Sequence, residues 1–254
     1  MPKVIEANSN DALLGIIERL ALLETTFGSS LRTPLQKFRL STTDDPIIAV
    51  QKAGRRIAQH LNLSDLTFIV LIRSQEENVA GRIHIDDSPD MVQIELSTKI
   101  VQFPEVVLST LCHEITHKYL SRHNIKLDDT LANEKLTDTA SVYLGLGIFM
   151  LEGCECERTT YLADRRSVTS THMGYLSPEE FSLTFALSNP FRQKAILRQS
   201  WSPTAVRRIE FAERVLRARN LALDNECDIH GEMLARIEVV FEATTERCNR
   251  SILP

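Results

Sequence analysis

The sequence lacks the features that define several classes of protein. Its five cysteines are an odd number scattered along 254 residues, which does not fit the disulfide framework of a secreted protein. The N-terminal residues lack the apolar core of a signal peptide, and the charge-free run at 139–151 is shorter than a membrane span. We therefore expect reduced thiols in a cytoplasmic protein that has no membrane association.

An excess of positive charge is also absent. The formal net charge is -5 at pH 7, which argues against a general electrostatic affinity for nucleic acid. The arginine-rich run at 207–219 is interleaved with Glu210 and Glu213, as in a solvated, salt-bridged helix face. We therefore expect no nucleic acid partner. The C-terminal helices are expected to cover the core, to offer a surface to a protein partner, or both.

The apolar residues are numerous enough for a substantial core, since they make up 43% of the chain. Over 11–27 they recur close to a 3.6-residue period, with Gly28 as the expected end of a helix. A second helix is predicted to begin at Pro46, after an aspartate cap, and to run to about Leu61.

Short β-rich runs follow these helices. The segments 66–72, 80–85 and 91–96 have the length of strands, and the second and third alternate apolar with polar residues. The links between them are short and polar. This pattern predicts an antiparallel meander.

The next predicted helix begins at Pro104 and carries the main candidate site. His113, Glu114 and His117 stand in the order H-E-x-x-H, so a helix places both imidazoles on one face, one turn apart. This spacing suits two ligands of one zinc ion, with the glutamate able to reach a water in an open metal position. The alternative is a helix that carries two histidines by chance. However, this helix is apolar on nearly all sides, so its histidines need partners in a buried setting.

A second buried helix is predicted over 133–151, with Gly145 and Gly147 as points of close packing. Glu134 and Asp138 lie one turn apart at its head, and carboxylates that enter a core are rarely unpaired. The alternative for either residue alone is an acid favoured by the helix dipole.

Together the two helices resemble the gluzincin metallopeptidases, the thermolysin-like group. The shared pattern is H-E-x-x-H followed by E-x-x-x-D on the next helix, here His113 to His117 and then Glu134 to Asp138. The resemblance covers residues 66–150. It implies that an edge strand before the first helix lines the cleft and pairs with extended substrate.

The resemblance also implies a role for each residue of the pattern. His113, His117 and Glu134 would be the ligands of a zinc ion, Zn2+, and Glu114 would be the base that deprotonates the zinc-bound water. Asp138 would orient a ligand imidazole and raise its basicity.

Other residues near the motif have weaker assignments. Thermolysin-like enzymes supply a histidine or tyrosine that stabilises the oxyanion, and His172 and Tyr175 are our candidates because their loop precedes a helix cap at 177–180. The run Glu152-Gly-Cys154 is similar to the metal-binding motif of peptide deformylases, but there the cysteine precedes the histidine helix. We interpret Cys154 and Cys156 as structural.

The predicted fold class is α+β, with a zincin-like core in which a small antiparallel sheet packs on two active-site helices. The predicted divisions are an N-terminal helical segment (1–65), the catalytic core (66–175) and a C-terminal helical region (176–254). The expected function is that of a zinc-dependent metallopeptidase, which hydrolyses a peptide or protein substrate through a zinc-bound water activated by Glu114. The alternative is a zincin-like binding or regulatory domain with little or no turnover, and the intact Glu114 favours the enzyme.

Overall fold

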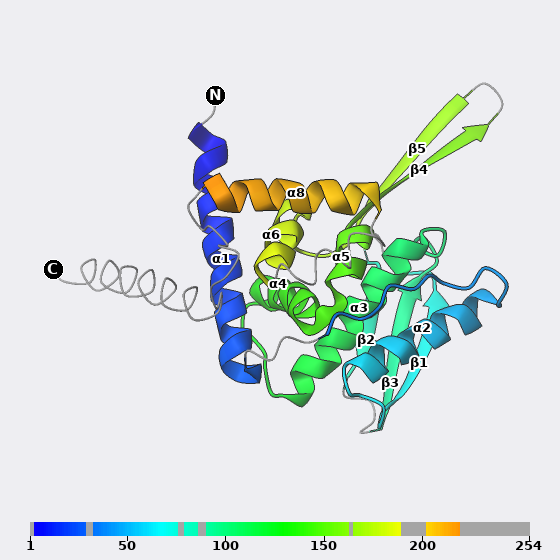
Figure 1. Cartoon of the computed structure of the whole chain (residues 1–254). Helices are drawn as coiled ribbons and strands as arrows, with labels where there is room; N and C mark the ends of the chain where they lie inside the picture. Colours follow the sequence, from blue (N-terminus) through cyan, green and yellow to red (C-terminus); the bar gives the residue numbers. More distant parts are fainter. Residues whose placement is uncertain are drawn as a thin grey trace.

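The fold is of the α+β class, with a small sheet on one side of a group of helices (Figure 1). The computed structural model describes residues 3–28, 33–75, 79–85, 90–162, 165–188 and 202–218. Within these ranges, no helix combines the length and the apolar character that crossing a bilayer requires. The predicted divisions at residues 65 and 175 stay predictions.

The sheet has three strands in the order β1-β3-β2 and is mixed, so the predicted antiparallel meander is wrong. β1 (Thr67–Arg73) runs parallel to β3 (Met91–Ser97), whereas β2 (Gly81–His84) is antiparallel to β3. The chain therefore passes from β1 to the far edge of the sheet and returns through its centre.

Burial explains why β3 is central. Its apolar residues Val92, Ile94 and Leu96 are fully buried, whereas the short β2 carries an exposed arginine, Arg82. A strand with this polar content is tolerated at an edge, while the central position goes to the strand that buries the most apolar surface. The alternation of residues in the sequence identifies the strands but does not rank them for the central position.

Two helices cover the same face of the sheet. α2 (Pro46–His60) begins where predicted, with the Asp45 side chain accepting a hydrogen bond from the backbone N of Ile47 at 2.9 Å. α3 (Pro104–Arg122) packs beside it and carries the H-E-x-x-H motif. The side chain of Gln51 bonds to the backbone of Phe68 and Val70, which satisfies polar groups at the β1 edge.

The predicted helix over 133–151 is interrupted. α4 (Thr130–Ser141) passes into a π-helical turn, η1 (Val142–Leu146), and then into α5 (Gly147–Gly153). The interruption lies at Gly145, whose φ of +89° is left-handed. Both glycines are closely packed, as predicted. A Cβ at Gly145 would lie 3.1 Å from His60 Nε2, and one at Gly147 would lie 2.6 Å from the Phe185 ring.

A hairpin that the sequence analysis did not predict follows α5. β4 (Glu155–Leu162) and β5 (Arg165–His172) pair in an antiparallel ladder and extend away from the helices (Figure 1). After it come α6 (Pro178–Ser188) and α8 (Pro203–Ala218), which agree with the predicted helical character of these two segments. Residues 189–201 and 219–254 of the predicted C-terminal helical region lie outside the described residues.

The N-terminal helix packs on this second group of helices. α1 (Lys3–Phe27) ends at Gly28 as predicted, and its residues Leu13, Ile16 and Leu20 form a small apolar cluster with α6 and α8. Arg19 Nε donates a hydrogen bond to Thr139 Oγ1 on α4 at 2.9 Å. α1 therefore contacts the helix that carries the candidate carboxylates.

Two left-handed glycines give a test of this architecture. A Cβ at Gly28 would meet no atom of the described residues within 4 Å, whereas one at Gly145 would also lie 3.1 Å from Thr33 O. We expect Gly28→Ala to lower the free energy of unfolding by about 1–2 kcal/mol through backbone strain alone. Gly145→Ala should add about 1–3 kcal/mol of overpacking. Urea unfolding of both variants measures the difference, and equal losses would contradict the close packing at Gly145.

Candidate metal and catalytic site

The two histidines of the motif lie on the face of α3 that is turned toward α4. Helical spacing places their rings one above the other, with centroids 4.6 Å apart and planes nearly perpendicular. His113 is 5% exposed, and His117 is half-buried. The predicted burial of this helix is confirmed, because most of its residues from Val106 to Leu120 are buried.

α4 brings a third ligand-type atom to these rings. Glu134 Oε2 lies 3.0 Å from His113 Nε2 and 3.0 Å from His117 Nε2, while the two Nε2 atoms are 3.0 Å from each other. These three side chains form a group that could hold a metal ion. The resemblance described above implied the same three residues as ligands.

The far side of each imidazole also has a partner on α4. His113 Nδ1 lies 2.8 Å from Asp138 Oδ1, and His117 Nδ1 lies 3.2 Å from Thr137 Oγ1. When each Nδ1 carries its hydrogen, each Nε2 presents a lone pair to Glu134 Oε2. Three electron-rich atoms at this separation repel one another unless a proton or a metal cation lies among them. The donor set therefore fits a metal ion.

The charges around His113 favour its cationic form in the absence of metal. Burial by itself lowers the pKa of a histidine, but Asp138, Glu134 and Glu114 together raise the pKa of His113 well above its usual value. Burial acts to raise the pKa of Glu134, but hydrogen bonds to His113 and His117 lower it to about 2. These charges therefore favour a proton on His113 in the metal-free cluster, and a metal ion that bound there would compete with that proton.

Glu114 lies beside this group, against the edge strand. A Cβ at Gly81 of β2 would stand 2.8 Å from Glu114 Oε1 and 2.5 Å from Thr110 Cγ2, so only glycine lets the strand come this close. Among the described residues, none forms a hydrogen bond with the Glu114 carboxylate. Burial, aided by the charges of Glu134 and Asp138, raises the pKa of Glu114. Its carboxylate is therefore available to a ligand in the cleft.

The cleft itself is a cavity of about 610 Å³ between β2, α3, α4 and the loop that follows β5. His113, Glu114, His117 and Glu134 line it, together with apolar side chains such as Ile83. It has the size and the mixed lining of a ligand site.

The two candidates for the oxyanion residue both line this cleft, but they differ in how they are held. The Tyr175 ring stacks on His113, with centroids 6.0 Å apart and 26° between the planes, and its side chain is half exposed. Burial and nearby carboxylates, Glu134 first, raise the pKa of Tyr175, so its hydroxyl stays protonated. His172 is exposed at the end of β5, and no described residue forms a hydrogen bond with its ring.

The deformylase-like run lies elsewhere. Cys154 Sγ contacts Leu151 O and the Arg208 guanidinium, and burial raises the pKa of this thiol to about 12. Burial likewise raises the pKa of Cys156 to about 11. Neither cysteine belongs to the group that could hold a metal ion. These contacts agree with the structural interpretation of both thiols.

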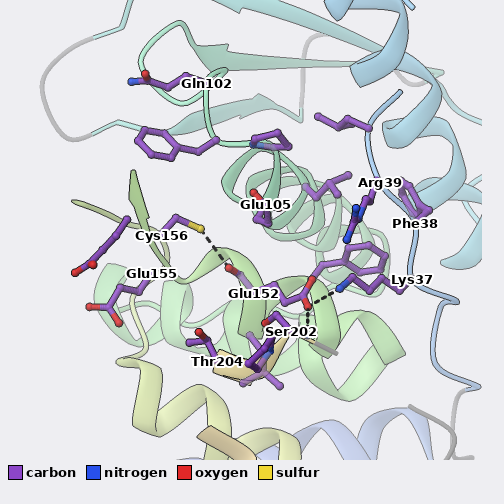
Figure 2. Close-up of a pocket in the computed structure, with 18 of the residues that line it drawn as sticks. Lys37, Phe38, Arg39, Gln102, Glu105, Glu152, Glu155, Cys156, Ser202 and Thr204 are labelled. Atoms are coloured by element: carbon purple, nitrogen blue, oxygen red, sulfur yellow. Dashed lines mark hydrogen bonds and ion pairs between the residues drawn. The ribbon is translucent and has the colours of Figure 1, made fainter. Parts of the chain in front are cut away.

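A larger cavity, of about 830 Å³, lies near the N-terminal end of α3 (Figure 2). Four of its charged side chains form two ion pairs. Glu152 Oε1 accepts hydrogen bonds from Lys37 Nζ at 2.6 Å and from Ser202 N at 2.9 Å (Figure 2). Arg208 pairs with Glu155 at 2.6 Å. The described lining of this cavity gathers no three metal-ligating groups. The group that could hold a metal ion and the Glu114 carboxylate both line the smaller cleft.

Two residues of the site, Gly81 and Thr137, were not predicted, although the sequence contains an indication of each. A glycine inside a strand pattern indicates close approach of the backbone, which is what Gly81 provides. Thr137 is three residues after Glu134 and one before Asp138, so helical spacing puts all three on neighbouring positions of one face.

The metal group can be tested by removing one ligand at a time. We expect the wild-type chain to bind about one divalent transition metal, and Glu134→Gln to weaken binding by more than the ~10- to 100-fold that losing a supporting residue costs. Glu105→Gln, an exposed glutamate on α3 outside the group, is the matched control and should leave affinity unchanged. Chelator competition and metal analysis measure both. Failure of the wild-type chain to take up metal would contradict the assignment.

Comparisons of the chain with protein-family models, with curated proteins and with solved structures gave no match. The assignment of the site therefore rests on the residues themselves, on their spacing and on the geometry described above.

Proposed function

We propose that this protein is a zinc-dependent peptidase that hydrolyses peptide bonds in the cleft between β2 and α3. One observation carries the proposal: His113 Nε2, His117 Nε2 and Glu134 Oε2 converge within about 3.0 Å of one another beside an unengaged glutamate. The order H-E-x-x-H then E-x-x-x-D gives further support, because it is the pattern of the gluzincin metallopeptidases.

Zinc is the ion that suits this donor set best. Two imidazole nitrogens and one carboxylate oxygen form a common ligand set of catalytic zinc and leave a position open. When bound, the ion would polarise a substrate carbonyl and lower the pKa of a water molecule. All three ligands line the cleft, so a substrate has access to them.

Glu114 is the general base in this proposal. Its buried carboxylate has no hydrogen-bonding partner among the described residues and has a raised pKa, so it is a stronger base than an exposed glutamate. It takes a proton from the attacking water and passes it to the amine that leaves. A domain that only binds peptides has no need of such a group.

Tyr175 is the better of the two candidates for the oxyanion residue. Its ring is fixed against His113, and its backbone N donates a hydrogen bond to Asp138 Oδ2 at 2.6 Å. A positioned, protonated hydroxyl can donate to the oxygen that becomes negative during attack. His172 has no comparable support from the described residues.

The role of Glu114 predicts a separation of metal binding from turnover. Glu114→Gln should keep about one zinc per chain while kcat on a quenched fluorescent peptide library falls by ~10²- to 10⁴-fold. His113→Ala, in contrast, should lose both zinc and activity. If the zinc-loaded wild-type chain cleaves none of the peptides yet binds them, the protein is a binding domain and the proposal is wrong.

Separate substitutions of Tyr175 and His172 test which of them stabilises the oxyanion. Tyr175→Phe keeps the stacked ring and should lower kcat by ~10²- to 10³-fold with zinc content unchanged. His172→Gln should leave kcat close to that of the wild type. The reverse result would assign the role to His172.

A further inference from the structure

Thr137 occupies a position in the site for which the gluzincin pattern has no counterpart. It lies on α4 between the ligand Glu134 and the supporting residue Asp138, and it is fully buried. Its hydroxyl oxygen is 3.2 Å from His117 Nδ1. The second imidazole of the motif therefore meets a neutral hydroxyl where the first meets a carboxylate.

The hydrogen bonds of Thr137 define which group donates to which. Thr137 Oγ1 also lies 3.0 Å from the backbone carbonyl of Asn133, which can only accept, so the single hydroxyl hydrogen goes to that carbonyl. The oxygen then has a lone pair left for the hydrogen on His117 Nδ1. The Asn133 side chain does not compete for this place, because its Oδ1 accepts from Leu127 N at 3.0 Å.

We infer that Thr137 is a positioning residue that holds His117 in the tautomer with a bare Nε2, ready to bind the metal ion; this inference rests on the metal site of the proposed function. With the hydrogen held on Nδ1, the Nε2 lone pair points at the atoms 3.0 Å away on His113 and Glu134. Without the hydroxyl, a buried N–H would have no acceptor, and the competing tautomer would direct a hydrogen at the metal position.

A hydroxyl here also limits the negative charge around the ion. Glu134, Glu114 and Asp138 already place three carboxylates at or beside the group. A neutral acceptor orients His117 without adding a fourth, and so preserves more of the positive charge that polarises a carbonyl.

Three variants test the inference. Thr137→Val keeps the shape of the side chain but removes the hydroxyl, and should weaken zinc binding by ~10- to 100-fold in chelator competition. Thr137→Ser keeps the hydroxyl and should restore affinity to near that of the wild type. Thr184→Val on α6 is the matched control: Thr184 is also fully buried and bonds to the carbonyl four residues earlier, at 2.8 Å, but lies outside the metal group, so zinc affinity should not change.

A spectroscopic measurement separates positioning from a purely structural role. In zinc-loaded protein with ¹⁵N-labelled histidine, the Nδ1–H of His117 should be protected from exchange with solvent in the wild type and in Thr137→Ser, and less protected in Thr137→Val. Equal zinc affinity and equal protection in wild type and Thr137→Val would overturn this inference alone. Absence of zinc binding by the wild type would overturn the proposed function together with it.

Discussion

The site depends on the hydrogen bonds that the buried carboxylate of Asp138 accepts. One oxygen accepts from His113 Nδ1 at 2.8 Å, and the other accepts from the backbone N atoms of Tyr175 at 2.6 Å and Leu176 at 3.0 Å. A carboxylate with no exposed surface is costly unless all its lone pairs are engaged. The histidine helix, the carboxylate helix and the loop after β5 therefore satisfy this group only together. The same side chain thus places His113, a candidate metal ligand, and Tyr175, a residue of the cleft.

The ligand-type residues could be predicted from the sequence because a helix converts spacing into direction. His117 follows His113 by four positions, and Asp138 follows Glu134 by four, so a helix puts each pair on one face whatever the rest of the chain does. The meeting of the two faces does not follow from spacing alone, and it was expected only because the order of the motifs resembles a known pattern. Thr137 was missed although its spacing is equally regular, since a threonine on a buried helix ordinarily bonds to its own backbone.

The pairing of the strands could not be predicted from local sequence patterns. Their positions were predicted from alternation, but the parallel pairing of β1 with β3 depends on which strand buries most apolar surface, and that is a property of the assembled sheet. The β4–β5 hairpin (155–172) escaped prediction because its residues are largely polar and show no apolar period. The interruption at Gly145 likewise depends on a contact with residues more than 80 positions earlier.

The residues of the metal group lie close to one another in the sequence. His113 and Glu134 are 21 residues apart, and His113 and Asp138 are 25 apart, so their contacts are more local in sequence than that of Asp138 with Tyr175. Tyr175 joins Asp138 across 37 residues, with the whole β4–β5 hairpin in between. The group that could hold a metal ion is thus contributed by two adjacent helices, and the cleft is completed by a later part of the chain.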